Sequence, residues 1–399
     1  MPVSSTPHHR PVVLLGGSIG SLSYARSLGR RGIDIHCLGT GASSPVSSSR
    51  YSTYREMGDV SKRESHWLEE LSSIGRRQGG RGVLFPTGDD TVLFASRHAI
   101  TLSENFSLNV PGEETVRTIL DKKAQYRFAE AAGVPVPRTL YPDEEDIESI
   151  AEEMDYPCLL KPRHSRIWRA TAGSKLTRVN SPGDLIRAYH CMARFDPKVM
   201  VQEMVPGGDD CLFGFLAYYG LDRRCLGWMT KRKLRQFPPL YGDGSLQESV
   251  REPRVEELSR RLLDGLGYRG MVGVEYKRGV DGEYRLIEIN PRSVSGNLLA
   301  TAAGVDLPFI AYSDICGSSA PGGVGFREGV RLINEFWDYR SFLEYRRAGR
   351  VSTAGWLRSV IGRGKVYAYF ARDDPGPFMS LLSRVGSERL KRIGGIAGE

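Results

Sequence analysis

One segment, residues 270–292, constrains the fold of this 399-residue chain more than any other part of it. It reads GMVGVEYKRGVDGEYRLIEINPR, in which two β-rich runs are joined by Asp281 and Gly282. An Asp-Gly pair between such runs is the strongest short-range signal for a hairpin turn. The sequence therefore predicts a β-hairpin with its turn at these two residues.

Two carboxylates lie in the predicted hairpin, Glu275 on the first strand and Glu288 on the second, each between apolar or aromatic neighbours. The turn places them near each other, and two buried carboxylates repel unless a cation joins them. Asn290 shares a face with Glu288 because strand side chains repeat every two residues. Magnesium prefers such oxygen ligands together with nucleotide phosphates, so we interpret the set as a magnesium–ATP site. The alternative is a salt bridge to Arg285 or Arg292.

Length and composition indicate a folded globular protein of two or three units, because 399 residues exceed what one hydrophobic core usually supports. Hydrophobic residues make up 40% and charged residues 26% of the chain, which argues against a disordered or fibrous class. The sequence has neither a secretory leader pattern nor a long apolar window, so a cytoplasmic protein without a membrane span is expected. Its six cysteines form no CxxC pair and are expected to be reduced thiols.

The net charge of +8 is compatible with nucleic acid, an anionic membrane surface or phosphorylated substrates. The basic clusters are separated along the chain and lack the interleaved aromatic residues of a groove that binds nucleic acid strands. We therefore expect most of them to be solvated surface, and we expect no nucleic acid partner.

The N-terminal part has the pattern of a β-α-β unit, with a strand over 12–15, a helix ending near Gly32 and a strand over 33–38. The glycines after the first strand resemble a dinucleotide-binding fingerprint only partly, because Leu15 replaces its first glycine and no acidic residue follows the second strand. A structural turn is the favoured interpretation, with a nucleotide site as the alternative.

Three units are expected along the chain. Residues 1–115 form a small α/β domain, which includes a helix starting near Asp89 and Asp90. Residues 116–319 form a second domain. Residues 320–399 are rich in aromatic and basic residues and are expected to form a helical tail.

Five motifs in order, DKKAQYRFAEAAGVPVP, YPCLLKP, VQEMVPGGDD, GVEYK and LIEINPR, resemble those of ATP-grasp enzymes from about residue 10 to residue 316. The resemblance implies an α/β (α+β) protein with the ATP-grasp fold. It also implies an N-terminal Rossmann-like pre-ATP-grasp domain, a lid over about 140–200 and a basic, mainly helical C-terminal tail.

The resemblance further implies roles for individual residues. These are Lys122 and Lys161 at the ATP phosphates, Gln202, Glu203 and Val205 at the adenine edge, Asp209 or Asp210 at the ribose, Glu275, Glu288 and Asn290 at magnesium, and Arg292 at the acyl phosphate or the substrate carboxylate.

Two stretches need separate interpretation. The lid has only Gly173 between residues 161 and 179 where many members are glycine-rich, so it is expected to close with side chains, namely Arg163, His164, Ser165 and Lys175. The stretch MTKRKLRQFPPLYGDGSLQES, residues 229–249, resembles the one that many ligases of the superfamily place over the acceptor site.

In that stretch Lys231, Lys233 and Arg235 alternate, so as a strand they would present a cationic row to an anionic substrate. We therefore assign Lys231 and Arg235, with Arg292, to the catalytic set. An exposed edge strand protected by charge is the alternative interpretation.

Enzymes of this superfamily use ATP to convert a carboxylate into an acyl phosphate, which an amine then attacks. The resemblance thus implies an ATP-dependent carboxylate–amine ligase similar to D-aspartate ligases. Its cofactors would be ATP and Mg²⁺ or Mn²⁺, its substrates a small carboxylate and an amine from amino acids or peptides, and its assembly a homodimer. Two alternatives stay open: an enzyme of the biotin carboxylase or carbamoyl phosphate type that activates bicarbonate, and a non-catalytic nucleotide-responsive binding protein.

Overall fold

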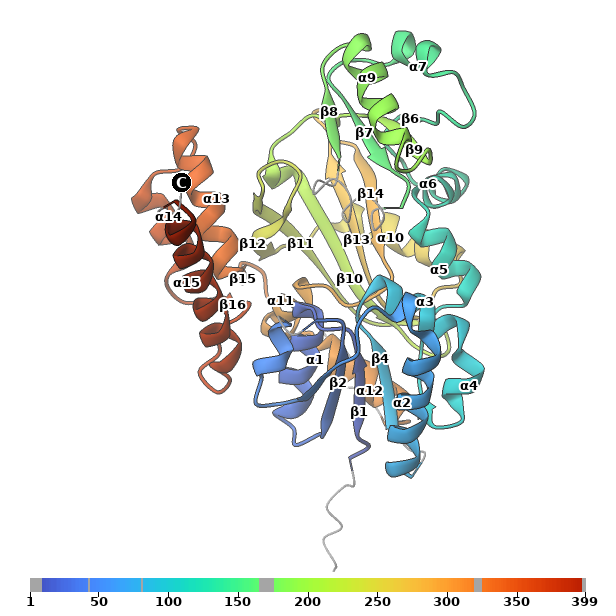
Figure 1. Ribbon diagram of the computed structural model, residues 1–399, viewed down its shortest axis with the longest axis vertical. Helices are drawn as coiled ribbons and strands as arrows, with labels where there is room; N and C mark the ends of the chain where they lie inside the picture. Colours follow the sequence, from blue (N-terminus) through green and yellow to red (C-terminus); the bar gives the residue numbers. More distant parts are fainter. Residues whose placement is uncertain (1–8, 42–43, 80–81, 165–175, 319–324, 397–399) are drawn as a thin grey trace, which may run out of the picture.

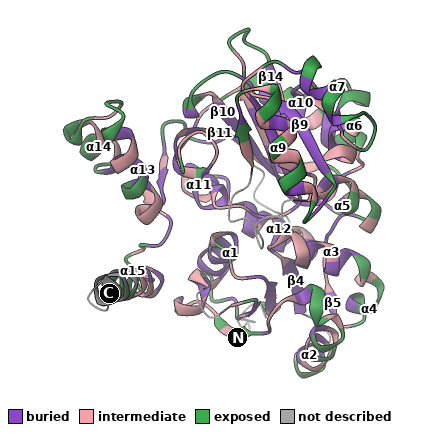
Figure 2. Cartoon of the chain, turned by 45° about the horizontal axis from the view of Figure 1, so that its top comes forward, coloured by how far each residue is buried: buried purple, intermediate pink, exposed green. Residues whose placement is uncertain are grey.

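A computed structural model describes residues 9–41, 44–79, 82–164, 176–318 and 325–396. These residues form three sheets, arranged one above another with the N-terminal sheet at the bottom of Figure 1 and the smallest sheet at the top. The sheet strands are mostly buried, and the exposed residues lie mainly on helices and loops (Figure 2). This arrangement agrees with the predicted α/β class.

The N-terminal sheet is parallel and has the order β3-β2-β1-β4-β5, which is the strand order of a Rossmann-like domain. Its strands are β1 (Val12–Leu15), β2 (Ile35–Gly39), β3 (Thr53–Glu56), β4 (Gly82–Pro86) and β5 (Phe106–Ser107). Its helices are α1 (Ile19–Gly29), α2 (Glu64–Arg77), α3 (Asp89–Arg97) and α4 (Ala99–Ser103). The predicted β-α-β unit is therefore present, and a helix begins at Asp89 as expected.

The central sheet has seven strands in the order β14-β13-β10-β11-β12-β15-β16. Its strands are β10 (Leu212–Tyr219), β11 (Cys225–Phe237), β12 (Asp243–Ser249), β13 (Gly270–Arg278), β14 (Tyr284–Asn290), β15 (Arg331–Ile333) and β16 (Lys365–Tyr367). One face packs against α6 (Lys122–Ala131) and α10 (Pro253–Gly265), which follow α5 (Glu113–Leu120) and β12, respectively. The other face packs against α11 (Gly296–Ala303) and α12 (Leu307–Ile315).

The third sheet, β6-β9-β7-β8, spans residues 139–203, close to the range of about 140–200 predicted for the lid. Its strands are β6 (Thr139–Leu140), β7 (Cys158–Pro162), β8 (Thr177–Val179) and β9 (Val199–Glu203). The helices α7 (Ile147–Glu153) and α9 (Pro182–Ala193) pack on it around their own small core. Ser165 and Lys175, two of the residues expected to close the lid, lie outside the described residues.

The C-terminal segment is mainly helical, with α13 (Glu335–Arg347), α14 (Thr353–Val360) and α15 (Gly376–Ile396) gathered at one side of the molecule (Figure 1). It also contributes β15 and β16 to the central sheet, so it shares that sheet with the preceding domain. Within the described ranges no single helix is long and apolar enough to cross a membrane. The bent pair α11 and α12 passes that test jointly, and both helices pack in the core.

Candidate active site

The hairpin of β13 and β14 places Glu275 directly opposite Glu288 in the antiparallel register. A bulge follows Glu275, and Asn290 lies opposite Gly273 further along the same pair of strands. The turn has Gly282 at φ +81°, a backbone conformation that glycine adopts without strain. The prediction that the two carboxylates meet across a hairpin is confirmed.

Two lysines of β11 reach Glu275 across β10. Lys233 Nζ donates to Glu275 Oε2 at 2.8 Å, and Lys231 Nζ lies 3.5 Å from Oε1. Burial lowers the pKa of Lys231, although Glu275 opposes this shift. Burial also disfavours the charged form of Lys233, but Glu275 more than offsets it and the pKa of Lys233 is raised. Lys233 is therefore the firmly charged partner of Glu275.

Gly214 in β10 leaves room for the Lys231 side chain to reach across that strand toward Glu275. It pairs with Lys231 on one side and with Glu275 on the other. A Cβ atom at this position would lie 2.8 Å from Lys231 Cε, too close for an unshifted neighbour. Sequence reasoning missed Gly214, because an isolated glycine in a strand has no local signature of a long-range lysine contact.

Glu288 faces a second pair of lysines from other elements. Lys122, the first residue of α6, has Nζ 3.6 Å from Glu288 Oε1. Burial opposes the charge on Lys122, but Glu288 more than compensates and the pKa of this lysine is raised. Lys161 in β7 donates to Gln202 Oε1 at 2.5 Å. Burial first, and then the charge of Lys122, lower the pKa of Lys161 to about 7.

The residues expected at the adenine edge lie at and just after the end of β9. The buried Gln202 side chain holds Lys161 and donates to Thr139 Oγ1 at 2.9 Å, so it positions a lysine. The carboxylate of Glu203 lies 3.4 Å from Arg285 Nε, and the Val205 side chain is buried.

The two aspartates proposed for the ribose differ sharply in environment. Asp209 is buried and accepts hydrogen bonds from the backbone and side-chain nitrogens of Gln236, from Leu240 N and from the Tyr345 hydroxyl. Burial raises the pKa of Asp209, while the hydrogen bonds from Gln236 and Leu240 oppose the shift. Asp210 is exposed. The carboxylate of Asp209 is thus committed to internal partners, which leaves Asp210 as the candidate for the ribose.

Arg292 connects the hairpin to the N-terminal domain. Its Nη2 donates to Asn290 Oδ1 at 3.0 Å, and its Nε donates to Asp89 Oδ1 at 2.6 Å. Asp89 is the first residue of α3, so the arginine joins two domains. The expected lid residue Arg163 is likewise held, by Asp121 and Asp143.

Arg235 was expected in one row with Lys231 and Lys233, and the structure corrects this. The pairing of β11 with β12 is irregular on both sides of Arg235, which disturbs the strict alternation. The guanidinium donates from Nε and Nη2 to the two oxygens of Asp338, both at 2.9 Å, and both residues are buried. Arg235 is therefore directed to α13 and away from the Glu275 cluster. The alternative of an edge strand is also wrong, because β11 lies between β10 and β12.

The oxygen donors of the hairpin fit a hard divalent cation. In the described part of the chain no group of three or more His, Cys, Asp or Glu side chains gathers as a metal site. A cation at the hairpin would therefore be held by two carboxylates, from Glu275 and Glu288, and the amide oxygen of Asn290. Carboxylate and amide oxygens of this kind suit Mg²⁺ or Mn²⁺, with remaining positions for phosphate oxygens or water.

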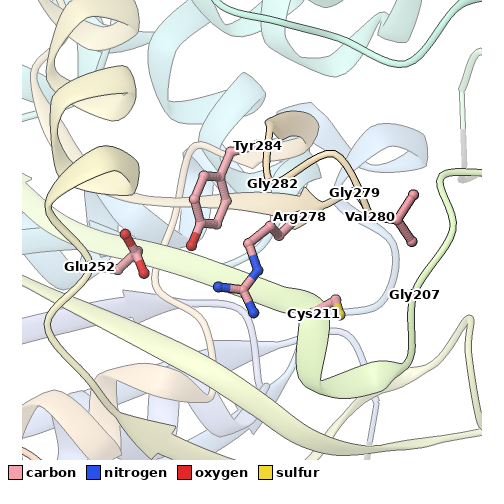
Figure 3. A pocket seen from close by; sticks show the side chains of 8 residues that line it. All are labelled: Gly207, Cys211, Glu252, Arg278, Gly279, Val280, Gly282 and Tyr284. Carbon is pink, nitrogen blue, oxygen red and sulfur yellow. The ribbon is translucent and has the colours of Figure 1, made fainter.

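A separate hollow of about 620 Å³ opens beside the hairpin turn (Figure 3). It is lined in part by Glu252, Arg278 and Tyr284, and none of the lysines around Glu275 and Glu288 lines it. The hollow therefore does not belong to the charged cluster.

Known proteins resemble this chain in sequence and in fold. The family model described as "ATP-grasp in the biosynthetic pathway with Ter operon" matches residues 228–335, a range that holds both carboxylates and Arg292. The chain carries an ATP-grasp domain.

Two curated relatives of this ATP-grasp chain are amino acid ligases. D-alanine–D-alanine ligase of Pseudomonas entomophila is 24% identical over 51% of the chain, and D-aspartate ligase of Enterococcus faecium is 25% identical over 58%. The matches span 66% and 58% of these relatives' lengths.

Solved structures share the fold over most of the chain. N5-carboxyaminoimidazole synthetase from Staphylococcus aureus, complexed with ADP, superimposes with a TM-score of 0.64 at 14% identity and covers 84% of this chain and 86% of its own. The L-amino acid ligase from Bacillus licheniformis gives a TM-score of 0.58 at 11% identity and covers 77% and 74%, respectively. At these identities the structural likeness establishes the ATP-grasp fold.

Proposed function

We propose that this ATP-grasp protein is an ATP-dependent ligase that joins a carboxylate to an amine. The observation that carries the proposal is the opposed pair Glu275 and Glu288, with lysines on both sides and Arg292 beside Asn290. A transferring phosphoryl group is stabilised by cationic and hydrogen-bond-donating side chains gathered around oxygen ligands, and here Lys122 and Lys233 have raised pKa values while Lys161 would gain its charge on binding phosphate. A salt bridge alone would not need four lysines from three different elements.

The nucleotide would lie between the smallest sheet and the central sheet. Lys122 and Lys161 would contact its phosphates as point charges, and Asp210 its ribose. The adenine edge would lie along residues 202–205, with Glu203 and Val205 contributing mainly backbone. A Mg²⁺ or Mn²⁺ ion held by Glu275, Glu288 and Asn290 would offset charge on the phosphates.

The reaction has two steps. A carboxylate oxygen attacks the γ-phosphorus of ATP, the bond to the β-phosphate oxygen breaks, and ADP leaves. The amine nitrogen then attacks the acyl carbon, inorganic phosphate leaves, and the amine loses a proton. In this proposal Arg292 would orient the carboxylate, and Lys231 and Lys233 would offset the negative charge that gathers beside Glu275.

An amino acid or peptide is the substrate class that we favour, because the curated relatives include D-alanine–D-alanine ligase and D-aspartate ligase. A second candidate is activation of bicarbonate. It is favoured by the fold similarity to N5-carboxyaminoimidazole synthetase complexed with ADP, and the same cluster would then receive bicarbonate in place of an organic acid.

Trapping with hydroxylamine tests the proposal. Hydroxylamine converts an acyl phosphate into a stable hydroxamate, so the protein with magnesium, ATP and pooled amino acids should form ADP and hydroxamate together. Turnover with bicarbonate alone would transfer support to the second candidate. Nucleotide binding without ADP release in any mixture would support a binding protein instead.

A further inference from the structure

The helix α13, in the C-terminal segment, is seated on the end of β11 through one face. Asp338 binds Arg235, and Ser341 Oγ donates to the Gln236 carbonyl at 2.8 Å. The Tyr345 hydroxyl donates to Asp209. The helix residues recur at intervals of three and four, so they share one helical face.

The same helix holds both ends of the connection between β11 and β12, residues 238–242. Before the connection, Phe237 stacks on Trp337 with ring centroids 4.9 Å apart, and the Arg340 guanidinium lies 4.4 Å from the centroid of the Phe237 ring. After it, the backbone of Asn334, the N-cap residue of α13, donates to the Ser245 carbonyl at 2.8 Å. The connection therefore has little freedom as long as α13 is in place.

This connection adjoins the charged cluster on both sides. Lys233 lies two residues before Arg235 on β11, and Asp243, at the start of β12, acts electrostatically on Lys231, Lys233 and Arg292. Leu240 within the connection donates its backbone N–H to Asp209, at 2.9 Å. Asp209 precedes the ribose candidate Asp210, so one hydrogen-bond network joins α13 to two sides of the site.

The C-terminal segment is also fixed to the N-terminal domain. Arg26 in α1 donates to Asp374 at 3.0 Å and to the Ala368 carbonyl at 3.1 Å, and Arg26 and Asp374 are almost fully buried. The segment thus binds the two domains that border the cluster.

We propose that α13 is a positioning element of the active site, and that Asp338 is its main positioning residue. By holding Arg235, Asp338 fixes the end of β11, keeps Lys231 and Lys233 directed at Glu275, and holds residues 238–242, which in the proposed reaction would border the acceptor amine. The positioning itself does not depend on the proposed function, and only its effect on catalysis rests on that function. The C-terminal segment is accordingly part of the catalytic unit.

Hydrogen–deuterium exchange tests the positioning independently of the reaction. In Asp338→Asn, one charge-assisted contact of Arg235 is weakened, so the backbone amides of residues 236, 237 and 240–245 should exchange about tenfold faster or more. Amides of the hairpin 270–292 should be unchanged. Tyr345→Phe removes only a hydroxyl and should speed the exchange of the same amides to a smaller degree. This milder variant keeps the test valid if Asp338→Asn does not fold. Tyr339→Phe on the same helix is the matched control, because Tyr339 is exposed.

A kinetic comparison separates positioning from general stability. With hydroxylamine as the acceptor, Asp338→Asn should raise the KM for hydroxylamine about tenfold, while the Kd for a non-hydrolysable ATP analogue changes less than about twofold. Asp338→Glu should restore part of the effect. Unchanged exchange over 236–245 in both variants would overturn the inference. Faster exchange without any turnover in the wild-type protein would contradict the proposed ligase activity and leave the positioning itself supported.

Discussion

Arg292 donates to Asp89 through two nitrogens, Nε at 2.6 Å and Nη2 at 3.3 Å, although the two residues are 203 positions apart in the chain. Asp89 begins a helix of the N-terminal domain, and Arg292 follows the last strand of the hairpin. A paired, two-point contact fixes the plane of a guanidinium as well as its position. The N-terminal domain therefore orients the arginine that we assign to the substrate carboxylate.

Asp89→Asn is expected to weaken carboxylate binding without affecting ATP. The amide loses one acceptor and the charge that hold the guanidinium, so the apparent KM for the carboxylate should rise about tenfold in the hydroxamate assay. The ion pair is partly exposed, with 44% of the Asp89 side chain accessible, so the free energy of unfolding should fall by less than about 1 kcal/mol. Asp90→Asn, at the same helix start, is the matched control. Equal KM values in the two variants would show that Asp89 has no orienting role.

Glu288→Ala is expected to abolish turnover while leaving the fold intact. The Glu288 side chain is 41% exposed and its partner Lys122 lies 3.6 Å away, so the loss of this ion pair costs little stability. Removing one of the two opposed carboxylates destroys the proposed cation site. ADP release and the thermal midpoint should be measured together, with Glu283→Ala in the hairpin turn as the control. Retained ADP release in Glu288→Ala would disprove the metal-ligand assignment.

Substitution of Asp209 should mainly lower stability, whereas substitution of Asp210 should mainly weaken nucleotide binding. Asp209→Ala leaves several buried donors without an acceptor, so it should lower the free energy of unfolding by about 3 kcal/mol or more. Asp210→Ala should leave stability unchanged within about 0.5 kcal/mol and weaken nucleotide binding. Denaturant titration and calorimetry with an ATP analogue check both values. A stable Asp209→Ala with weakened nucleotide binding would restore Asp209 as the ribose residue.

Nucleotide binding is expected to take up a proton at Lys161. In the free protein the pKa of Lys161 is lowered to about 7, so this lysine is largely neutral above that pH. Bound phosphate favours the charged form, so the pKa rises on binding, and binding above pH 7 should take up as much as about one proton.

Calorimetry of ATP-analogue binding at pH 8, in two buffers with different ionisation enthalpies, measures this proton uptake. Lys161→Met should lose most of the uptake and bind the nucleotide more weakly. Proton uptake equal to that of the wild type in Lys161→Met would assign the proton to another group.

The hairpin and its carboxylates could be predicted from the sequence because they depend on local rules. The turn chemistry at Asp281-Gly282 sets the register, and the register decides which residues face each other. The order of the other ATP-grasp motifs similarly located Lys122 and Lys161.

What could not be predicted depends on contacts between distant residues. The position of Arg235 follows from irregular pairing beside it and from Asp338, which lies 103 positions further along the chain. The Asp209 carboxylate is bound to internal partners in part because it accepts a hydrogen bond from Tyr345, 136 positions away. Neither partner has a local pattern that would reveal the contact, since each becomes a neighbour only when α13 packs on the central sheet.

Transfer of carboxylate oxygen to phosphate tests the acyl-phosphate chemistry most directly. The protein would be incubated with magnesium, ATP and amino acids whose carboxylates carry heavy oxygen, and the products would be examined by phosphorus NMR. We predict ADP and inorganic phosphate bearing one heavy oxygen, because the carboxylate oxygen that attacks phosphorus leaves with the phosphate. Formation of AMP and pyrophosphate, or of phosphate without heavy oxygen, would show that the carboxylate is not activated by phosphorylation.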